Sequence, residues 1–415
     1  MLKIKNINHS KIMKYFLLFL LFLFIYLTRK NTTFSNINSY EESSYFATWG
    51  TAIYLIRPPP GKLDNNSIRQ IFQVSTGGEK IRIKISNLMG NNDLEIKKIC
   101  IADLVSESEI DKKTMKYITF NGNYNIIIEK GKEIYSDTII YPLKTLSKIA
   151  ISIYFGTVPK FYSGHLLSLT YSYIEKGNKI KKRKFSNKKK VAHWYFISLI
   201  EISSDKPKKV LVCFGDSITD GVSKTNDARN NYPDILSRKL LEDKNFTDIA
   251  VINEGIDGNR LTIQGIQRYE HDVLNIKGIS YIIFLFGVND INGLNASSTD
   301  IISSYKTIIK KAHKKNIFIY GGTILPFALY KSRNVWNKKK EKVRQEVNKW
   351  IRETKPEKGG FDSFFDFDKL LKDPEDEIKL KNIYDCGDGI HPSLEGYMRM
   401  VENIDLQLFS INQKL

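Results

Sequence analysis

The chain has 415 residues, which is longer than one average domain and enough to bury more than one hydrophobic core. Hydrophobic residues make up 42% of it and charged residues 26%, a balance that excludes a globally disordered protein. The formal net charge of +19 comes largely from lysines scattered among Asn and Ile, and no nucleic-acid-binding motif accompanies it. We therefore expect no nucleic-acid partner and read the charge mainly as a compositional bias.

The cysteines exclude a disulfide framework, because the chain has only Cys100, Cys213 and Cys386. Cys213 lies within an apolar run, where a thiol acts as a small hydrophobic group. Cys386 stands two residues before Asp388, where a free thiol could be exposed beside a polar site. No spacing typical of metal ligands is present, so we expect neither a metal nor another cofactor.

The first thirty residues resemble a targeting signal. Four lysines lie among the first fourteen residues, and Tyr15 to Leu27 is almost entirely Leu, Phe and Ile. This apolar run is shorter than the about 20 residues of a spanning helix, and no small-residue cleavage site follows it. We expect residues 1–30 to be an uncleaved membrane anchor or, as the alternative, a cleaved signal peptide. Either one makes the protein extracytoplasmic, membrane-anchored or secreted, with residues 31–44 as a polar linker.

Residues 45–205 show the pattern of a β-sandwich domain. Short runs of β-branched and aromatic residues recur there, separated by Gly and Asn. The expected strands are Ile81–Ile85, Ile126–Ile128, Thr138–Tyr141, Ile149–Phe155 and Leu166–Tyr173. Several short strands at such spacing favour antiparallel sheets packed face to face.

The sharpest run of charge in this half is Lys179–Lys190. We interpret it as a solvated loop between two strands. The alternative is an electrostatic contact with an anionic envelope surface.

Residues 206–415 alternate between strand-like and helical patterns. The expected strands are Val210–Phe214, Ile249–Asn253, Ile279–Phe286 and Ile317–Gly321, and the expected helices are Tyr232–Asp243, Ser298–Lys315, Lys338–Thr354 and Ser393–Leu408. Such alternation predicts an α/β domain with a parallel sheet that is covered on both faces.

Three side chains in this half suit acyl transfer. Ser217 directly follows an apolar strand, at the edge where parallel sheets place reactive groups, and is the candidate nucleophile. His391 is the candidate general base, since the ordinary pKa of histidine lies near neutrality. Asp388, three residues earlier, would orient the imidazole and stabilise its charged form.

Ester cleavage also needs donors for the oxyanion. The candidates are the amide of Ser217, a backbone amide at the glycines of the stretch Asn253–Arg260 after the second strand, and the side chain of Asn289 after the third. Taken singly, each has an ordinary explanation as a turn, a helix cap or a packed loop. Their joint occurrence on a strand–helix scaffold favours a reactive site.

These motifs resemble the SGNH (GDSL-type) hydrolase superfamily. The similar segments are Gly215-Asp216-Ser217-Ile218-Thr219 for block one, Ile256-Asp257-Gly258-Asn259 for block two, Gly287-x-Asn289-Asp290 for block three and Asp388-x-x-His391-Pro392 for block five. Further segments resemble a bacterial subgroup of secreted acylhydrolases that carry an N-terminal β-sandwich, namely Asn253-x-Gly255-x-x-Gly258-Asn259-Arg260-Leu261, Gly322-Thr323-x-x-Pro326-Phe327 and Tyr384-Asp385-x-Gly387-Asp388. Phe286 departs from the subgroup, which often has an acidic residue before block three.

The resemblance implies a flavodoxin-like three-layer α/β/α domain and metal-free hydrolysis of acyl or acetyl esters through an acyl-enzyme. It implies a Ser217–His391–Asp388 triad, with Ser217, Gly258 and Asn289 forming the oxyanion hole and Gly255 as the second choice for its glycine. The substrate would be a small-molecule, polysaccharide or lipid ester. Two alternatives remain: a polysaccharide- or envelope-binding protein with an idle hydrolase domain, and an acyltransferase to a sugar.

Overall fold

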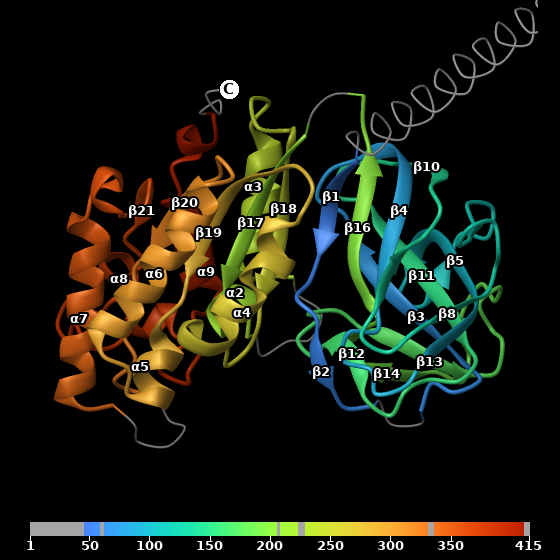
Figure 1. Ribbon diagram of the computed structural model, residues 1–415, viewed down its shortest axis with the longest axis horizontal. Helices are drawn as coiled ribbons and strands as arrows, with labels where there is room; N and C mark the ends of the chain where they lie inside the picture. The colour runs from blue at the N-terminus through green and yellow to red at the C-terminus, as the bar shows by residue number, and fades with distance from the viewer. Residues whose placement is uncertain (1–44, 59–61, 206–207, 223–228, 331–335, 411–415) are drawn as a thin grey trace, which may run out of the picture. The chain divides into compact units, whose positions relative to one another are not determined.

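The computed structural model describes residues 45–410, except for 59–61, 206–207, 223–228 and 331–335 (Figure 1). The signal or anchor expected over residues 1–30 and the linker over 31–44 lie outside the described residues. Among the helices that are described, none has the length and apolar character needed to cross a membrane. Phe46–Leu415 form one compact unit, and the domain boundary between residues 205 and 206 stays a prediction.

The C-terminal half is built on a five-stranded parallel sheet, which we call the parallel sheet. Its strands are β17 (Lys209–Gly215), β18 (Ile249–Gly255), β19 (Ile279–Leu285), β20 (Phe318–Gly322) and β21 (Ser363–Phe365). They lie in the order β18-β17-β19-β20-β21, and every pair is parallel (Figure 1). Numbered along the chain, this is the 2-1-3-4-5 order of flavodoxin-like sheets. The predicted parallel sheet is confirmed, and only the three-residue β21 was missed.

The central strand shows why the apolar runs in this half are continuous. All five residues from Val210 to Phe214 are fully buried. A strand covered on both faces has no solvent side, so its sequence need not alternate. This is why four strands of the parallel sheet could be predicted from unbroken apolar segments of the sequence.

Helices follow the strands of the parallel sheet. They are α2 (Ser217–Asp220), α3 (Tyr232–Glu242), α4 (Ile266–Tyr269), α5 (Val288–Leu294), α6 (Ser298–His313), α7 (Lys338–Glu353), α8 (Phe367–Leu371) and α9 (Leu394–Glu402). Two π-helical turns, Leu261–Gly265 and Glu270–Leu274, flank α4. Three predicted helices are confirmed within two residues at each end. The three-layer arrangement stays a prediction.

The predicted helix Ser393–Leu408 is wrong in its second half. Helix α9 ends at Glu402, and a separate 3₁₀ turn covers Leu406–Phe409. The side chain of Asp405 caps that turn by accepting a hydrogen bond from the amide of Gln407 at 2.9 Å. An aspartate that bonds the backbone in this way interrupts a helix. The apolar periodicity continues through the interruption, so the sequence pattern alone did not show where the helix ends.

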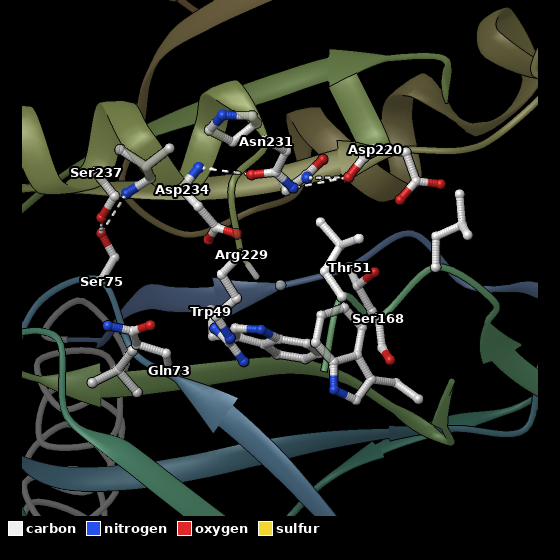
Figure 2. Close-up of a pocket in the computed structure, with 18 of the residues that line it drawn as sticks. Trp49, Thr51, Gln73, Ser75, Ser168, Asp220, Arg229, Asn231, Asp234 and Ser237 are labelled. Carbon is white, nitrogen blue, oxygen red and sulfur yellow. Dashed lines mark hydrogen bonds between the residues drawn. The ribbon is translucent and has the colours of Figure 1, made fainter. Parts of the chain in front are cut away.

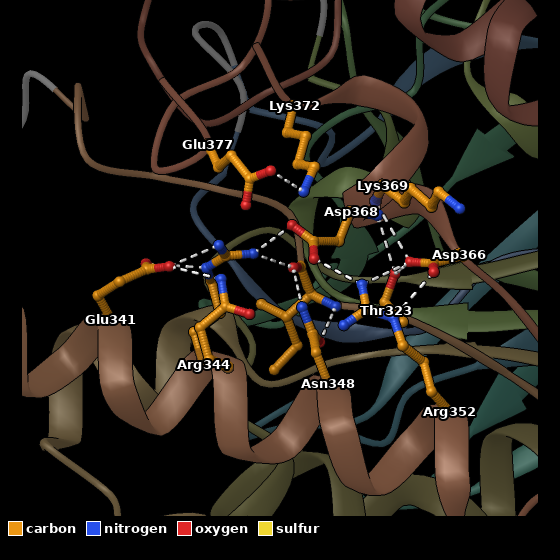
Figure 3. A network of polar contacts seen from close by, with 12 residues as sticks. Thr323, Glu341, Arg344, Asn348, Arg352, Asp366, Asp368, Lys369, Lys372 and Glu377 are labelled. Atoms are coloured by element: carbon orange, nitrogen blue, oxygen red, sulfur yellow. Dashed lines mark hydrogen bonds and ion pairs between the residues drawn. The ribbon is translucent and has the colours of Figure 1, made fainter. Parts of the chain in front are cut away.

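A network of buried charges holds the segment that follows β20 (Figure 3). Arg344 on α7 is fully buried, donates to the carboxylate of Asp368 and also donates to the carbonyl of Ile324 at 3.0 Å. Asn348, one turn later, accepts from the amide of Ile324 at 2.7 Å and donates to its carbonyl at 2.9 Å. This part of the loop is thus clamped to α7.

The N-terminal half contains antiparallel sheets, and we call it the antiparallel region. One sheet has the order β1-β16-β4-β10, with β9 beside β4, and a second has the order β14-β13-β3-β11-β5-β6, with β7 and β8 beside β5. A small third sheet has the order β15-β12-β2. The bounds are β1 (Tyr45–Gly50), β2 (Tyr54–Ile56), β3 (Asn66–Gln73), β4 (Gly78–Ser86), β5 (Leu94–Ser106), β6 (Glu109–Ile110), β7 (Lys116–Ile118), β8 (Ile126–Ile128), β9 (Glu133–Tyr135), β10 (Ile139–Leu143), β11 (Lys148–Phe155), β12 (Tyr162–His165), β13 (Ser172–Lys176), β14 (Lys189–Val191), β15 (Trp194–Tyr195) and β16 (Ile197–Ser203).

Side chains from the two larger sheets form one core, with Ile81, Ile83 and Ile85 of β4 in the same cluster as Ile151 and Ile153 of β11. The predicted antiparallel character is confirmed.

The predicted strand Leu166–Tyr173 is wrong, because residues 166–171 are irregular and lie between β12 and β13. Leu169 has φ 48°, a left-handed conformation that no strand contains.

The lysine-rich run forms a loop between β13 and β14, as predicted, but its backbone is not simply solvated. The guanidinium of the buried Arg69 lies beneath it and donates to the carbonyls of Ile180 at 3.0 Å and Lys182 at 2.8 Å. It also lies 4.3 Å from the ring centroid of Phe185, which is itself buried. The lysine side chains at 181, 182, 184, 189 and 190 remain exposed.

Candidate active site

The candidate residues gather at the carboxyl edge of the parallel sheet. Ser217 follows β17, and Asn289 lies in α5 after β19, the strand paired with β17. In a 2-1-3-4-5 sheet the chain reverses direction between these two strands, and ligands bind in the crevice outside such a switch point. Gly258 lies in the loop after β18, on the other side of β17.

Ser217 is positioned by the turn that ends β17. Asp216 caps α2 by accepting a hydrogen bond from the amide of Ile218 at 3.1 Å, so Ser217 is the first residue of this four-residue helix. Burial raises the pKa of Asp216 to about 7. Only 3% of Ser217 is exposed, which keeps bulk water away from its hydroxyl.

Ser217, His391 and Asp388 form one continuous series of hydrogen bonds. His391 Nε2 lies 2.8 Å from Ser217 Oγ, and His391 Nδ1 lies 2.6 Å from Asp388 Oδ2. A carboxylate accepts, so Nδ1 carries the proton and donates, which leaves the Nε2 lone pair to accept from the serine hydroxyl. The sequence predicted these three residues, and the structure brings all three together.

Asp388 is held in its charged form. Burial raises its pKa, but the hydrogen bonds from the His391 ring and from the amides of His391 and Ile390 outweigh burial and hold the pKa well below its ordinary value. Those amides donate to Oδ1 at 3.0 and 3.1 Å, while Oδ2 accepts from the ring. One carboxylate oxygen thus shapes the loop, and the other orients the imidazole.

Asp385 shapes the same loop from its other end. Its Oδ1 accepts from the amides of Gly387, Asp388 and Gly389 at 2.7, 3.1 and 3.0 Å. Gly389 has φ 84°, and a Cβ there would lie 2.2 Å from the carbonyl of Leu329, so only glycine fits. The Asp-x-Gly-Asp motif at residues 385–388 could have identified this turn from the sequence, although we assigned Asp385 no role.

Cys386 does not act as a reactive thiol in this geometry. Burial and the charge of Asp388 raise its pKa to about 11. Ligand atoms of Cys386, Asp388 and His391 lie within 4.8 Å of one another, the one such metal-like group among the residues described. The set does not fit a metal, because both His391 nitrogens already have hydrogen-bond partners, Asp388 and Ser217.

The oxyanion candidates lie at the same sheet edge. Gly258 has φ 69° and is exposed, and a Cβ there would meet nothing within 4 Å. Asn289 donates one amide hydrogen to the carbonyl of Asn259 at 3.1 Å and keeps a second hydrogen for another acceptor. Gly255, the second choice for the oxyanion glycine, has a packing role, since a Cβ there would lie 2.2 Å from the amide nitrogen of Asp220.

Two charged residues to which we assigned no role tie the loops together. The carboxylate of Asp290 accepts from the amides of Leu261 and Thr262, both at 2.9 Å, and so joins α5 to the loop after β18. Asp290 belongs to the third quoted motif, but the sequence assigned it no role of its own.

Arg268 links the same loops to β17. It donates to the carbonyl of Gly215 at 2.9 Å, the carbonyl of Glu254 at 2.8 Å and the side chain of Asn259 at 2.8 Å. No local pattern in the sequence marked Arg268. Phe286, the departure from the subgroup, packs against Phe214 with ring centroids 4.9 Å apart and lies 5.8 Å from the Arg268 guanidinium.

Residues 213–399 match the family described as the GDSL-like lipase/acylhydrolase family. This part of the chain is therefore a GDSL-type (SGNH) hydrolase domain, as its motifs predicted. No curated protein matches the chain significantly.

Solved structures of the same kind match about half of the chain. A member of the lipolytic protein G-D-S-L family from Veillonella parvula is 22% identical and covers 49% of this chain and 100% of its own, with a TM-score of 0.37. The lipase/acylhydrolase from Enterococcus faecalis is 18% identical and covers 50% and 99%, with a TM-score of 0.40. An acetyl xylan esterase from Geobacillus stearothermophilus is 19% identical and covers 48% and 93%, with a TM-score of 0.34.

Proposed function

We propose that the protein is a serine esterase that hydrolyses carboxylic esters, acyl or acetyl, through an acyl-enzyme. The observation that carries this proposal is the unbroken hydrogen-bond series from Asp388 through His391 to Ser217. A serine hydroxyl is a weak nucleophile until an adjacent base takes its proton, and this series supplies that base in the required orientation.

The reaction would run in two halves. In the first, Ser217 Oγ attacks the ester carbonyl carbon while its proton moves to His391 Nε2. The tetrahedral intermediate then collapses, the carbon–oxygen bond to the alcohol breaks, and the alcohol leaves with the proton from Nε2. In the second half, water gives a proton to Nε2 and attacks the acyl carbon, the bond between that carbon and Ser217 Oγ breaks, Oγ takes the proton back from Nε2, and the carboxylic acid is released. Asp388 stabilises the imidazolium in both halves.

The oxyanion would accept hydrogen bonds from the amides of Ser217 and Gly258 and from the side chain of Asn289. Removing one such donor typically lowers kcat by about 10²- to 10³-fold. Asn289 is already oriented by its bond to Asn259, so little reorganisation is needed when the charge develops.

A fluorophosphonate probe tests the nucleophile directly, because it labels only activated serines. We expect mass spectrometry of the full-length protein to find a single adduct on Ser217, absent from Ser217→Ala and from His391→Ala. Turnover of p-nitrophenyl acetate should fall by about 10⁴- to 10⁶-fold in both variants. A folded wild-type protein without an adduct, or Ser217→Ala with wild-type turnover, would contradict the proposal.

Sugar acyl transfer uses the same residues and differs only in which hydroxyl attacks the acyl-enzyme. Adding a sugar acceptor and measuring acylated sugar against released acid separates it from hydrolysis.

The exposed lysines of the loop between β13 and β14 support a second function, binding to an anionic envelope polymer. Extracytoplasmic location, with a membrane anchor or signal in residues 1–30, belongs to the same proposal. Cosedimentation of Ser217→Ala with anionic vesicles tests this binding independently of turnover.

A further inference from the structure

A buried histidine of the antiparallel region contacts the helix that carries Ser217. His165, the last residue of β12, is 2% exposed. Its Nε2 lies 2.9 Å from Oδ1 of Asp220, the last residue of α2, and its Nδ1 lies 2.9 Å from the carbonyl oxygen of Ala52. The contact joins residues that are 55 positions apart in the chain.

The two partners of His165 determine its charge. A backbone carbonyl can only accept, so Nδ1 must donate to Ala52, and Nε2 faces a carboxylate that also accepts. Both nitrogens therefore carry protons, and His165 is an imidazolium opposite the Asp220 carboxylate. Burial lowers the pKa of His165, but the charge and hydrogen bond of Asp220 outweigh burial and raise it above its ordinary value.

The second oxygen of Asp220 reaches the loop after β18. Oδ2 accepts a hydrogen bond from the amide of Asp257 at 2.9 Å, and Asp257 directly precedes Gly258. The main chain of Asp220 is fixed as well, because its carbonyl accepts from the side chain of Asn231 at 2.8 Å (Figure 2). The carboxylate of Asp220 thus bridges His165 and the oxyanion loop, which we define as residues 256–259.

We propose that His165 is a positioning residue for ester hydrolysis, which holds the oxyanion loop through the Asp220 carboxylate. The inference rests on the proposed function, since it concerns the donors of that same site. Without the imidazolium, the buried carboxylate would lose its charge partner and shift, and the Asp257 amide would follow it. A displacement of about 1 Å in such a group can lower the rate by about 100-fold.

The proposal also predicts that activity declines at alkaline pH, which gives the pH–activity profile an alkaline limb. When His165 loses its proton, Nε2 becomes an acceptor that faces a carboxylate, and the bridge opens. The other titratable groups around the pair are Arg268, Asp257, which carries the held amide, and two tyrosines, Tyr54 and Tyr397, whose hydroxyl pKa values are raised by burial and by Asp220. Among these groups and His165, the one that donates to the Asp220 carboxylate from the antiparallel region is His165.

The test replaces His165 by Gln, which can donate to one of the two acceptors but turns an oxygen toward the other. With p-nitrophenyl acetate we expect kcat to fall by about 10- to 100-fold with little change in KM. The alkaline limb of the wild type should be absent from the variant. His165→Asn has the same defect in a smaller side chain and serves where His165→Gln does not fold.

Ser75→Ala is the matched control. Ser75 also belongs to the antiparallel region, and its hydroxyl lies 2.9 Å from the hydroxyl of Ser237 on α3 (Figure 2). It further accepts from the amide of Val251 at 2.9 Å, in the middle of β18 and away from the oxyanion loop. Like Asp220, it lines a cavity of about 50 Å³. We expect Ser75→Ala to lower the unfolding midpoint while kcat and the pH profile stay at wild-type values.

Hydrogen exchange supplies a readout that does not depend on turnover. Peptides covering residues 256–259 should exchange faster in His165→Gln than in Ser75→Ala, while the core strands exchange equally. Equal exchange in these peptides, or an unchanged kcat and alkaline limb in His165→Gln, would overturn the inference. Failure of the fluorophosphonate to label wild-type Ser217 would instead overturn the proposed function, and the exchange experiment would still decide the role of His165.

Discussion

Each half of the molecule places an arginine against a phenylalanine ring: Arg69 is fully buried, and the side chain of Arg268 is 12% exposed. Arg69 in the antiparallel region lies 4.3 Å from the centroid of Phe185, and Arg268 beside the parallel sheet lies 4.4 Å from that of Phe214. Each guanidinium donates to several backbone carbonyls from different segments. As local structures, the two arrangements are nearly the same.

They differ in what they hold. Arg69 holds carbonyls of the lysine-rich loop, a surface segment. Arg268 holds the end of β17 just before Ser217 and the side chain of Asn259 just after Gly258. The comparison shows that a buried arginine organises whichever loops its five donors reach, and only the position of Arg268 couples it to the reactive site.

Removing Arg268 should have the largest effect in this comparison. Arg268→Met keeps the contact with Phe214 but leaves the carbonyls of Gly215 and Glu254 without their donor, and each such loss costs about 1–3 kcal/mol of unfolding free energy. Turnover of p-nitrophenyl acetate should fall by about 10²-fold or more, as for a misplaced oxyanion donor. Chemical denaturation would first establish a temperature at which the variant is folded, and kcat/KM would then be measured at that temperature. Turnover within threefold of wild type would show that the loops keep their geometry without Arg268.

Removing Arg69 should change stability and not turnover. Arg69→Met leaves the buried carbonyls of Ser108 and Ile180 without this donor, and each costs about 1–3 kcal/mol. The unfolding free energy should fall by that amount or more, while kcat and KM of the folded protein stay at wild-type values. A selective loss of kcat at unchanged stability would mean that the lysine-rich loop contributes to the site.

The smallest expected effect is a pH dependence at a contact between the two halves. His271 lies 2.8 Å from Glu133 of β9 and 2.6 Å from Asp272, and these hydrogen bonds raise the pKa of His271 to about 10. A raised pKa stabilises the folded state fully below the ordinary histidine value, and the stabilisation is lost as pH rises toward about 10.

The unfolding midpoints of wild type and His271→Gln should therefore differ most near pH 6 and converge near pH 10. A difference that grows with pH would contradict the assigned direction. The side chain of His271 is 41% exposed, so solvent screening keeps the effect modest.

Much of the fold could be predicted because the signals are local. Continuous apolar runs such as Val210–Phe214 identified the buried strands, and the change to helical periodicity identified the parallel sheet. The failures have equally local causes: Asp405 caps a new turn inside a periodic segment, and Leu169 takes a left-handed conformation inside an apolar one. The strand β21 was too short to show any period.

The candidate site also contains residues that local sequence patterns predicted and residues that they did not. Ser217, Asp388 and His391 were recognisable because each lies in a short motif with a defined spacing, and the parallel sheet brings strand-end motifs to one edge whatever their separation along the chain. The supports of that site were not recognisable. Arg268, Asp290 and His165 act on segments that only the folded chain places beside them.

The physical reason is that the structural role of a buried charged residue depends on the groups that it pairs with. Arg69 and Lys182 lie 113 positions apart, and His165 and Asp220 lie 55 apart, so neither pair leaves a pattern within a window of sequence. Periodicity and short motifs report which residues are apolar and which are reactive. Which carboxylate, carbonyl or amide each buried cation meets depends on tertiary packing alone, and here that packing links the antiparallel region to the loop that carries Gly258.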